Sequence, residues 1–193
     1  MFKNQNPRPL LTSALIVLTF LLSLGSCGED DGMVEDPGAV EKIELGSEYQ
    51  GGIIFYIDGT GQHGLVAART DQSTSDPWYN GDFVTTNALS STDGKANTEH
   101  IVKAQGNTGT YAAKICRDYK GGGYDGWFLP SKDQLNLLYQ NRHLLDNFAE
   151  EIYWSSTEYD IGSAWVQDFT NGDQYLDNTS DRANVHTRAI REF

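Results

Sequence analysis

Residues 121–141 read GGGYDGWFLPSKDQLNLLYQN, and this stretch contains the signals that decide the fold. Its three leading glycines predict the end of a preceding helix, because glycine adopts the left-handed cap geometry without steric cost. The apolar run 127–129 predicts a short buried strand, which Pro130 ends because the residue before a proline disfavours helix. Ser131 and Gln134 then form an S-x-x-Q capping box that starts a helix. A strand and a helix joined by this short corner indicate the centre of one domain.

The part of the chain before this stretch predicts a β-hairpin followed by two helices. Residues 51–57 are rich in β-branched and aromatic residues, and a glycine-containing turn separates them from a second apolar run at 64–68. Asn97 is expected to cap a short first helix, and either Thr108 or Thr110 is expected to begin the second.

The part after the stretch predicts mainly strands. Asn171 and Gly172 stand between two strand-like runs, which is a strong hairpin signal because both residues tolerate the positive φ of a type I′ turn. The expected strands are residues 153–156, 163–169, 173–176 and 185–191. Central helices flanked by hairpins predict an α+β domain with a mainly antiparallel sheet and two or three helices.

The first 45 residues are not expected to belong to the fold. Lys3 and Arg8 precede a fifteen-residue apolar run at 10–24. This run is shorter than the roughly 20 residues of a membrane-spanning helix and is typical of a leader peptide. The segment that follows is acidic and contains several glycines, and so predicts an extended tether. The predicted organisation is a leader peptide at 1–26, a tether at 27–45 and a domain at 46–193.

The end of the leader resembles a bacterial lipobox, because Leu24, Gly25 and Ser26 directly precede Cys27. In such proteins the cysteine is lipidated and becomes the first residue of the mature chain, which its acyl chains hold to a membrane. The acidic run at 29–31 resembles the signal that exports some Gram-negative lipoproteins to the outer face of the outer membrane. The sequence therefore predicts an outer-membrane lipoprotein exposed at the cell surface. The alternatives are an ordinary secretory signal with an incidental cysteine, and a tether that is merely solvated.

The charge of the chain restricts its partners. The formal net charge at pH 7 is −13, and cleavage of the leader would change it to −15 by removing Lys3 and Arg8. A protein this acidic is not expected to bind nucleic acid or to dock directly on anionic lipid. Membrane attachment is therefore expected through the lipid anchor alone.

Several side chains are predicted to be structural. Cys116 lies on the apolar face of the second predicted helix and is expected to be a buried, unreactive thiol. Trp127 and Trp154 are expected in the core. Arg188 and Arg191 are expected to pair with carboxylates of this acidic domain.

Short motifs occur in order along residues 51–193. They are GGIIFY at 51–56, GQHGLVAA at 61–68, YDGWFLPSKDQL at 124–135, YWSSTE at 153–158, AW at 164–165, FTNG at 169–172 and RAIREF at 188–193. Together they resemble the domain at the C-terminus of bacterial collagen-like adhesins (the Lcl-C type), a domain of unknown function in most of its members. The resemblance implies a C-type-lectin-like fold, distantly similar to the formylglycine-generating enzymes, with loops on one side forming a ligand surface. Those enzymes use cysteine and copper, for which this chain offers only Cys116, so catalysis is not expected.

Aromatic and polar side chains in the C-terminal region are the candidate ligand contacts. Exposed aromatic rings there could stack on sugar rings, and the alternative is that they pack in the core or across strands. The candidate ligand-binding residues are Tyr159, Asp160, Trp165, Asn171, Gln174, Tyr175 and Asn178.

A polar loop that contains Asp177 and Asp181 could supply oxygen ligands to Ca²⁺. The alternative is a turn in which Asp and Asn side chains bond their own backbone, and the loop lacks the glycine and the distal glutamate of an EF-hand. The sequence has no HExxH motif, Cys/His cluster or P-loop, so no other cofactor is expected.

The function most consistent with these features is a non-catalytic surface lipoprotein that binds a glycan or protein ligand, for adhesion or ligand capture. A second hypothesis is a structural or assembly component of a cell-surface complex or appendage. A third is an enzyme distantly related to the formylglycine-generating enzymes.

Overall fold

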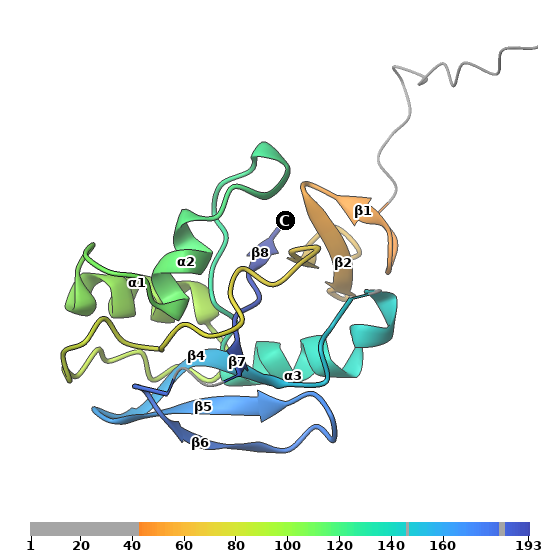
Figure 1. The fold of residues 1–193 in the computed structure, drawn as a ribbon. Helices are drawn as coiled ribbons and strands as arrows, with labels where there is room; N and C mark the ends of the chain where they lie inside the picture. Colours follow the sequence, from red (N-terminus) through yellow and green to blue (C-terminus); the bar gives the residue numbers. More distant parts are fainter. Residues whose placement is uncertain (1–42, 146, 182–183) are drawn as a thin grey trace, which may run out of the picture. The chain divides into compact units, whose positions relative to one another are not determined.

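Two four-stranded sheets organise the residues that the computed structural model describes, 43–145, 147–181 and 184–193 (Figure 1). The first sheet has the strand order β1-β2-β3-β8 and the second the order β6-β5-β4-β7. The strands are Glu48–Tyr49 (β1), Gly52–Ile57 (β2), Gly64–Ala67 (β3), Ile152–Asp160 (β4), Ser163–Asp168 (β5), Gln174–Asn178 (β6), Val185–His186 (β7) and Ile190–Glu192 (β8). All paired strands are antiparallel except β4 and β7, which are parallel. The predicted α+β class with mainly antiparallel pairing is confirmed.

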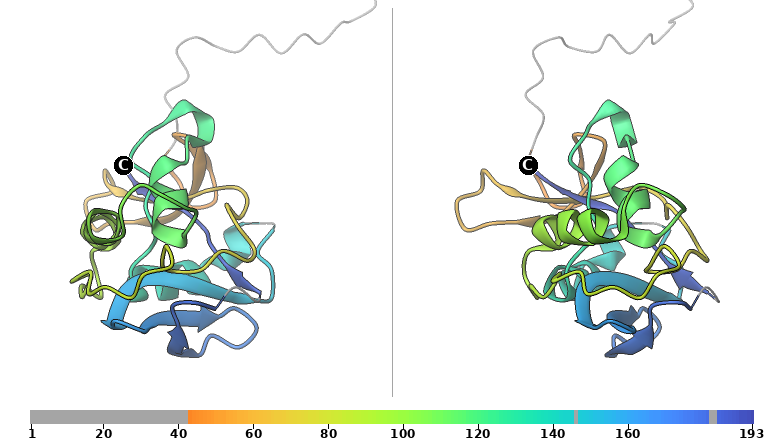
Figure 2. Two further views of the ribbon diagram at one scale, coloured as in Figure 1. Left: turned by 60° about the vertical axis from the view of Figure 1, so that its left-hand side comes forward. Right: turned by 90° about the vertical axis from the view of Figure 1, so that its left-hand side faces the viewer.

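Three helices come between β3 and β4 in the chain: α1 (Gly94–Gln105), α2 (Ala112–Asp118) and α3 (Lys132–Gln140). Helix α3 contacts β4 and β5 of the second sheet and also β2 of the first, so it joins the two sheets. Helices α1 and α2 contact each other, and α1 contacts β4. Figure 2 shows the β2–β3 hairpin projecting from the side of the domain.

Of the two elements predicted around Pro130, the helix that starts after Ser131 is confirmed, and the strand at 127–129 is wrong. The Ser131 N–H donates to Gln134 Oε1 at 3.0 Å and the Gln134 N–H donates to Ser131 Oγ at 3.4 Å, which completes the predicted capping box. Instead of a strand, only Phe128 pairs, in a single bridge with Ile190. The next N–H, of Leu129, donates to a threonine hydroxyl of α1 and is not available to a sheet.

The starts of α1 and α2 differ from the prediction. Asp93 caps α1, because its Oδ1 accepts from the Ala96 N–H at 2.8 Å. Asn97 lies within the helix and is buried. Tyr111 is the cap of α2, so neither predicted threonine begins that helix. Asp93 and Asn97 are both residue types that cap helices well. The Asn97 side chain bonds the backbone of Ser90 and does not cap the helix, so α1 begins earlier, after Asp93.

The β5–β6 hairpin is confirmed, but its turn is not of type I′. Of the two turn residues only Gly172 has a positive φ, of 90°. The Asp168 N–H donates to Asp173 O at 2.9 Å, and the Gly172 N–H donates to Asp168 O at 2.7 Å. These bonds close a four-residue loop in which Asn171 does not need the left-handed conformation.

The predicted last strand at 185–191 is divided between the two sheets. β7 pairs with β4, whereas β8 pairs with β3. Between them the Thr187 N–H donates to Ser73 O at 2.9 Å, and Arg188 is buried. The break therefore allows the Arg188 side chain to turn into the protein, where a continuous strand would keep its residues in one sheet.

The core consists of two hydrophobic clusters, and all their members lie within residues 43–193. The first contains Trp78, Trp127, Trp154 and Cys116, and the second contains aromatic and aliphatic residues that include Phe55. The core positions predicted for both tryptophans and for the cysteine are confirmed. This part of the chain thus contains its own core, as an independently folding domain does.

No helix among the described residues is both long and apolar enough to cross a bilayer. The predicted leader at 1–26, the predicted lipidation site Cys27 and most of the predicted tether lie outside the described residues.

Candidate functional site

The seven predicted ligand-binding residues do not form one surface. Val166 pairs with Tyr175, and Trp165 pairs with Leu176. Directly paired residues point to the same face of a sheet and successive residues to opposite faces, so Trp165 and Tyr175 lie on opposite faces. Asn171 lies in the loop at one end of the β5–β6 hairpin.

The other polar candidates lie elsewhere on the hairpin. Asn178 pairs with Ser163 at the opposite end from Asn171, and Asp160 pairs with the same serine from β4. Four residues of strand separate the two ends, which corresponds to about 14 Å. One ligand-binding patch would have to span this distance and both faces.

Hydrogen bonds within the protein occupy most of the polar candidates. Gln174 Nε2 donates to Lys132 O at 2.8 Å. Asn171 Oδ1 accepts from the Asp173 N–H at 2.8 Å. Asp160 and Asn178 accept from backbone N–H groups two residues later, each at 2.9 Å. These contacts stabilise turns and the junction with α3.

The aromatic candidates differ in their accessibility. The Trp165 ring is half-buried, with Lys132 Nζ 3.4 Å from its centroid. Tyr159 is 60% exposed and Tyr175 is 37% exposed. Partial burial raises the pKa of Tyr175, and the nearby Asp177 carboxylate adds to the effect. Tyr159 is therefore the candidate with the most accessible ring.

The predicted calcium ligands, Asp177 and Asp181, lie in a loop that bonds its own backbone. Asp177 Oδ1 accepts from the Asn178 N–H at 2.7 Å, and the Asp181 N–H donates to Asn178 O at 2.9 Å. Within the described residues, no three His, Cys, Asp or Glu side chains are placed to hold one ion. The geometry matches the alternative of a turn that bonds its own backbone.

A buried carboxylate that the sequence analysis did not select lies at the end of β4. Glu158 is 3% exposed, and its oxygens accept from the N–H groups of Thr86 at 3.0 and 3.1 Å and of Asn87 at 2.9 Å. The Glu158 N–H donates to Ala88 O at 2.8 Å. Within the described residues Glu158 forms no ion pair, so backbone N–H groups offset the cost of burying its charge. Its only signal in the sequence is an acidic residue two positions after the strand predicted at 153–156.

The segment held by Glu158 forms one side of a cleft of about 440 Å³. We call this the α1 cleft, and it is lined by Thr85, Thr86, Asn87, His100, Lys103 and Ala104. Asn87 has a φ of 61°, which is uncommon outside glycine and often marks functional segments. His100 of α1 contacts Asn87 O through Nδ1 at 3.0 Å, so Asn87 is held from both sides. Tyr159 follows Glu158 directly in β4 and is not among the residues that line this cleft.

No family model matches this chain, and a comparison with curated proteins finds no match. The resemblance to the Lcl-C type of domain therefore stays a prediction.

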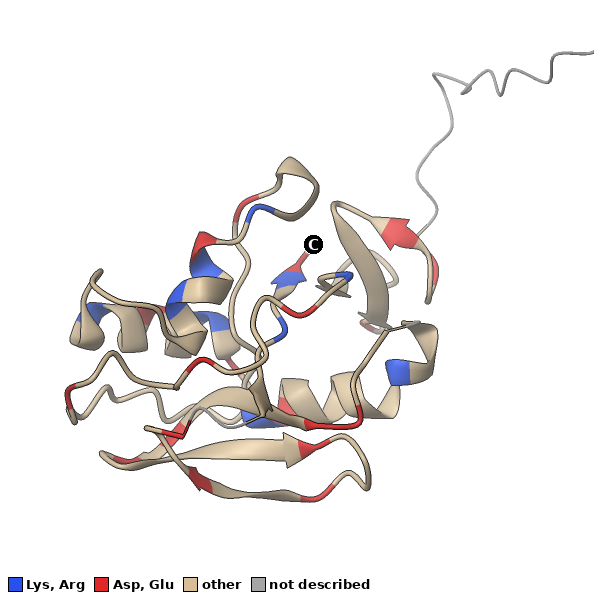
Figure 3. Ribbon diagram, in the orientation of Figure 1, with Lys and Arg blue, Asp and Glu red and all other residues tan. Residues whose placement is uncertain are grey.

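The distribution of charge separates the α1 cleft from the second sheet. Helices α1 and α2 carry Lys95, Lys103, Lys114 and Arg117, whereas residues 150–181 contain acidic residues and no Lys or Arg (Figure 3). Within the described residues Lys103 has no ion-pair partner. The α1 cleft therefore presents a free ammonium group on a strongly acidic protein.

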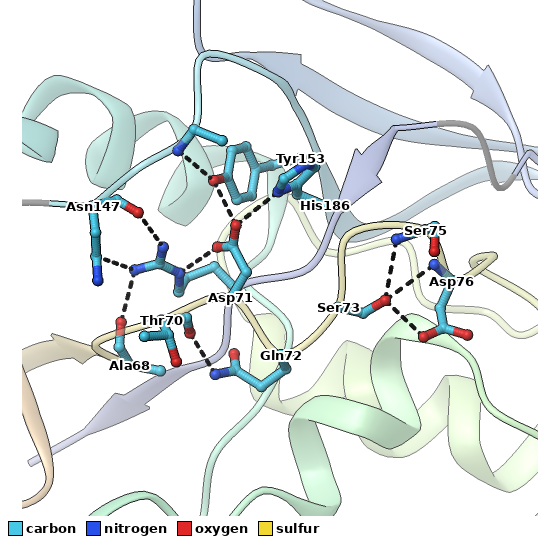
Figure 4. A network of polar contacts seen from close by, with 12 residues as sticks. Ala68, Thr70, Asp71, Gln72, Ser73, Ser75, Asp76, Asn147, Tyr153 and His186 are labelled. Atoms are coloured by element: carbon cyan, nitrogen blue, oxygen red, sulfur yellow. Dashed lines mark hydrogen bonds and ion pairs between the residues drawn. The ribbon is translucent and has the colours of Figure 1, made fainter.

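A second polar cluster, centred on Asp71, is closed by its own contacts (Figure 4). The Asp71 carboxylate accepts from Arg188 Nε at 2.6 Å, from Tyr153 OH at 3.0 Å and from His186 Nδ1 at 2.7 Å. Arg188 also donates to Ala68 O at 2.9 Å. The predicted carboxylate partner of Arg188 is confirmed, and the cluster holds the link between β7 and β8 in place.

The prediction for Arg191 is wrong in its partner. Arg191 Nε donates to the Asp125 carbonyl oxygen at 2.7 Å, and its guanidinium also contacts the Gln50 side chain. Its role is structural, but it joins two backbone segments through neutral acceptors and not through a carboxylate.

Replacing Glu158 with glutamine is expected to lower the free energy of unfolding by about 2 kcal/mol, because the charge-assisted bonds from Thr86 and Asn87 are lost. Denaturant titration of the variant measures this change. Glu99→Gln is the control, since Glu99 is exposed and an exposed substitution changes stability by less than about 0.5 kcal/mol. Equal stabilities of the two variants would contradict the role of Glu158 in fixing the cleft.

The stability of the protein is expected to fall above about pH 10. Burial raises the pKa of Tyr111 to about 12, and burial also raises the pKa of Tyr153. An unfolded tyrosine loses its proton near pH 10, whereas these folded tyrosines keep theirs, so stability is complete below about pH 10 and is lost as the pH rises toward 12. Denaturant titrations at pH 8 and at pH 11 test this, and Tyr111→Phe should show a smaller loss. If Tyr111→Phe loses as much stability between pH 8 and pH 11 as the unaltered protein does, the prediction is contradicted.

Proposed function

We propose that this chain is a lipoprotein of the Gram-negative outer membrane whose folded domain lies at the cell surface and binds a glycan or protein ligand without catalysis. The leader-like residues 1–26, Cys27 and the acidic tether support this cellular location. The observations that carry the binding role are the polar α1 cleft of about 440 Å³ and, separately, the exposed ring of Tyr159. Clefts lined by a few fixed polar groups and accessible aromatic rings are both features that suit ligand recognition.

The position of Cys116 supports a non-catalytic role. The thiol is fully buried in α2, and burial raises its pKa well above the usual range. A thiol must be accessible and ionisable to act as a nucleophile or to bind a metal. The cysteine-dependent chemistry of the formylglycine-generating enzymes is therefore not proposed for this domain.

Glycan-array binding of the chain from Gly28 to Phe193 tests the binding role. We expect retention of a defined set of glycans, and we expect Tyr159→Ala to weaken that binding about tenfold, because a lost aromatic contact of about 1.4 kcal/mol has this effect. Tyr56→Ala, which removes a ring of 38% exposure from β2, is the matched control. If no glycan and no purified surface protein binds, or if the two variants bind equally, the proposal fails.

Fractionation of cells tests the proposed location at the outer membrane. Cys27→Ser is expected to release the protein from the membrane fraction, because the acyl chains have no other attachment point. Protease added to intact cells is expected to degrade the domain while a periplasmic marker survives. Protection of the domain until the outer membrane is permeabilised would show that it faces the periplasm.

The open edge of the second sheet favours one other function, that of an assembly component. β6 is an outermost strand, and Leu176 on it is 38% exposed. Exposed edge strands pair readily with strands of other chains. A photo-crosslinking residue at position 176 that yields one discrete adduct on intact cells would favour assembly over ligand capture.

A further inference from the structure

Most backbone groups of residues 86–88, in the loop that lines the α1 cleft, bond within the protein. The N–H groups of Thr86 and Asn87 donate to Glu158, and that of Ala88 donates to Thr86 Oγ1 at 3.2 Å. The carbonyl of Asn87 accepts from His100, and that of Ala88 accepts from the Glu158 N–H. An extended peptide would find few free backbone groups to pair with here, so recognition has to use side chains.

The side chains at the opening of the cleft are, in contrast, free. Within the described residues, Thr85, Asn87 and Lys103 are exposed, and no hydrogen bond or ion pair occupies their side-chain polar atoms. Their backbone is fixed by the loop contacts and by α1. Polar groups held on a rigid frame lose little entropy when a ligand binds, which favours affinity.

The contact of His100 with Asn87 fixes which ring nitrogen faces the ligand. A carbonyl oxygen can only accept, so the 3.0 Å contact requires the proton on Nδ1. In the neutral ring Nε2 is then an acceptor. The cleft thus combines an acceptor at His100, a donor at Lys103 and groups that do both at Thr85 and Asn87. The neighbouring hydroxyl groups of a sugar, which each donate and accept, match this combination.

The charge balance favours a neutral sugar over an acidic one. The Lys103 ammonium faces the cleft, but the buried Glu158 carboxylate lies directly behind the same loop. Glu99 is also exposed on α1, one residue before His100. These carboxylates oppose the attraction of Lys103 for an anion.

We propose that the α1 cleft is a binding subsite for one neutral sugar residue, with Thr85, Asn87, His100 and Lys103 as its polar contacts. This inference rests on the proposed binding function and specifies the ligand class and the place where it binds. The cleft volume of about 440 Å³ is in the range of small-ligand sites, about 300–1,000 Å³.

Nuclear magnetic resonance of the labelled chain from Gly28 to Phe193 tests the subsite. The probes are the methyl glycosides of glucose, galactose, mannose and N-acetylglucosamine, with glucuronic acid as the charged comparison. We expect at least one neutral probe to shift the backbone signals of residues 85–87 and the Nε2 signal of His100, while Nδ1 stays bonded to Asn87. Lys103→Ala and Thr85→Ala are expected to weaken that probe about tenfold, equivalent to about 1.4 kcal/mol. Lys95→Ala, which is also on α1 but paired with Glu192, is the control and should leave the binding of that probe unchanged.

The outcomes separate the subsite from the proposed function. If glycans bind on the array but the shifts lie elsewhere, or the Lys103 and Thr85 variants bind as the unaltered chain does, the subsite is overturned and the binding function stands. Binding of glucuronic acid alone, or of none of the probes, overturns the neutral-sugar subsite. If neither the array nor the spectra show binding and no purified surface protein binds, both inferences fail. Because Lys103 and Thr85 are exposed, their replacement is not expected to change the fold. The spectra of the variants show whether the fold is retained.

Discussion

Asp71→Ala is expected to lower the free energy of unfolding by about 3–5 kcal/mol, the loss typical of breaking one partner of a buried ion pair. The side chain of Arg188 is 1% exposed, and Asp71 is its carboxylate partner. Without Asp71 the guanidinium stays buried with neutral acceptors alone, and Tyr153 OH and His186 Nδ1 also lose an acceptor. Denaturant titration measures the change.

Two further variants make this prediction specific. Asp82→Ala removes an exposed carboxylate and is expected to change stability by less than about 0.5 kcal/mol. The double variant Asp71→Ala with Arg188→Met is expected to be more stable than Asp71→Ala alone, because no uncompensated charge stays in the interior. A loss below about 1 kcal/mol in Asp71→Ala would mean that Arg188 finds water or another partner.

Gly51→Ala is expected to destabilise the domain by about 3 kcal/mol and to lower the melting temperature by roughly 6–12 °C. Gly51 has a φ of 85°, which alanine adopts only with strain. A Cβ atom at this position would also overlap the carbonyl oxygen of Gly121 and lie 3.1 Å from the Cα of Gly122. These neighbours are backbone atoms, so they cannot move aside as a flexible side chain would.

Gly59→Ala is the matched control for this substitution. Gly59 lies in the turn between β2 and β3, and a Cβ there would meet no atom within 4 Å. Thermal unfolding of both variants should separate a clash from a general effect of replacing glycine. If Gly51→Ala melts at the temperature of Gly59→Ala, the close approach of the two glycine-containing segments does not limit stability.

Features set by neighbouring residues were predictable from the sequence. The capping box at Ser131 depends on residues three positions apart, and the β5–β6 hairpin depends on a glycine between two strand-like runs. The burial of Trp127 and Cys116 followed from short apolar patterns. In these cases the local preference and the final contacts agree.

Features set by distant residues were not predictable. The break between β7 and β8 depends on Asp71, which is 117 residues from Arg188. The bonds of Glu158 reach 71 and 72 residues back along the chain to Asn87 and Thr86. No local pattern indicates which carboxylate meets which partner, so the sequence analysis selected neither.

The distribution of the candidate ligand-binding residues was unpredictable for a related reason. The alternation of side chains along β5 places Trp165 on one face of the sheet. Only the register between β5 and β6 shows that Tyr175 points to the other face. Without that register, residues close in sequence were grouped into one surface. The exposed polar residues of α1 were overlooked because an exposed lysine has no distinguishing pattern of its own.

The last residues of the chain belong to both sheets, since β7 closes one and β8 closes the other. Neither sheet can gain its final edge strand until residues 185–192 have been synthesised. Both sheets of the nascent domain therefore stay incomplete up to the same point of translation. A chain that stops after residue 183 would lack one strand of each sheet.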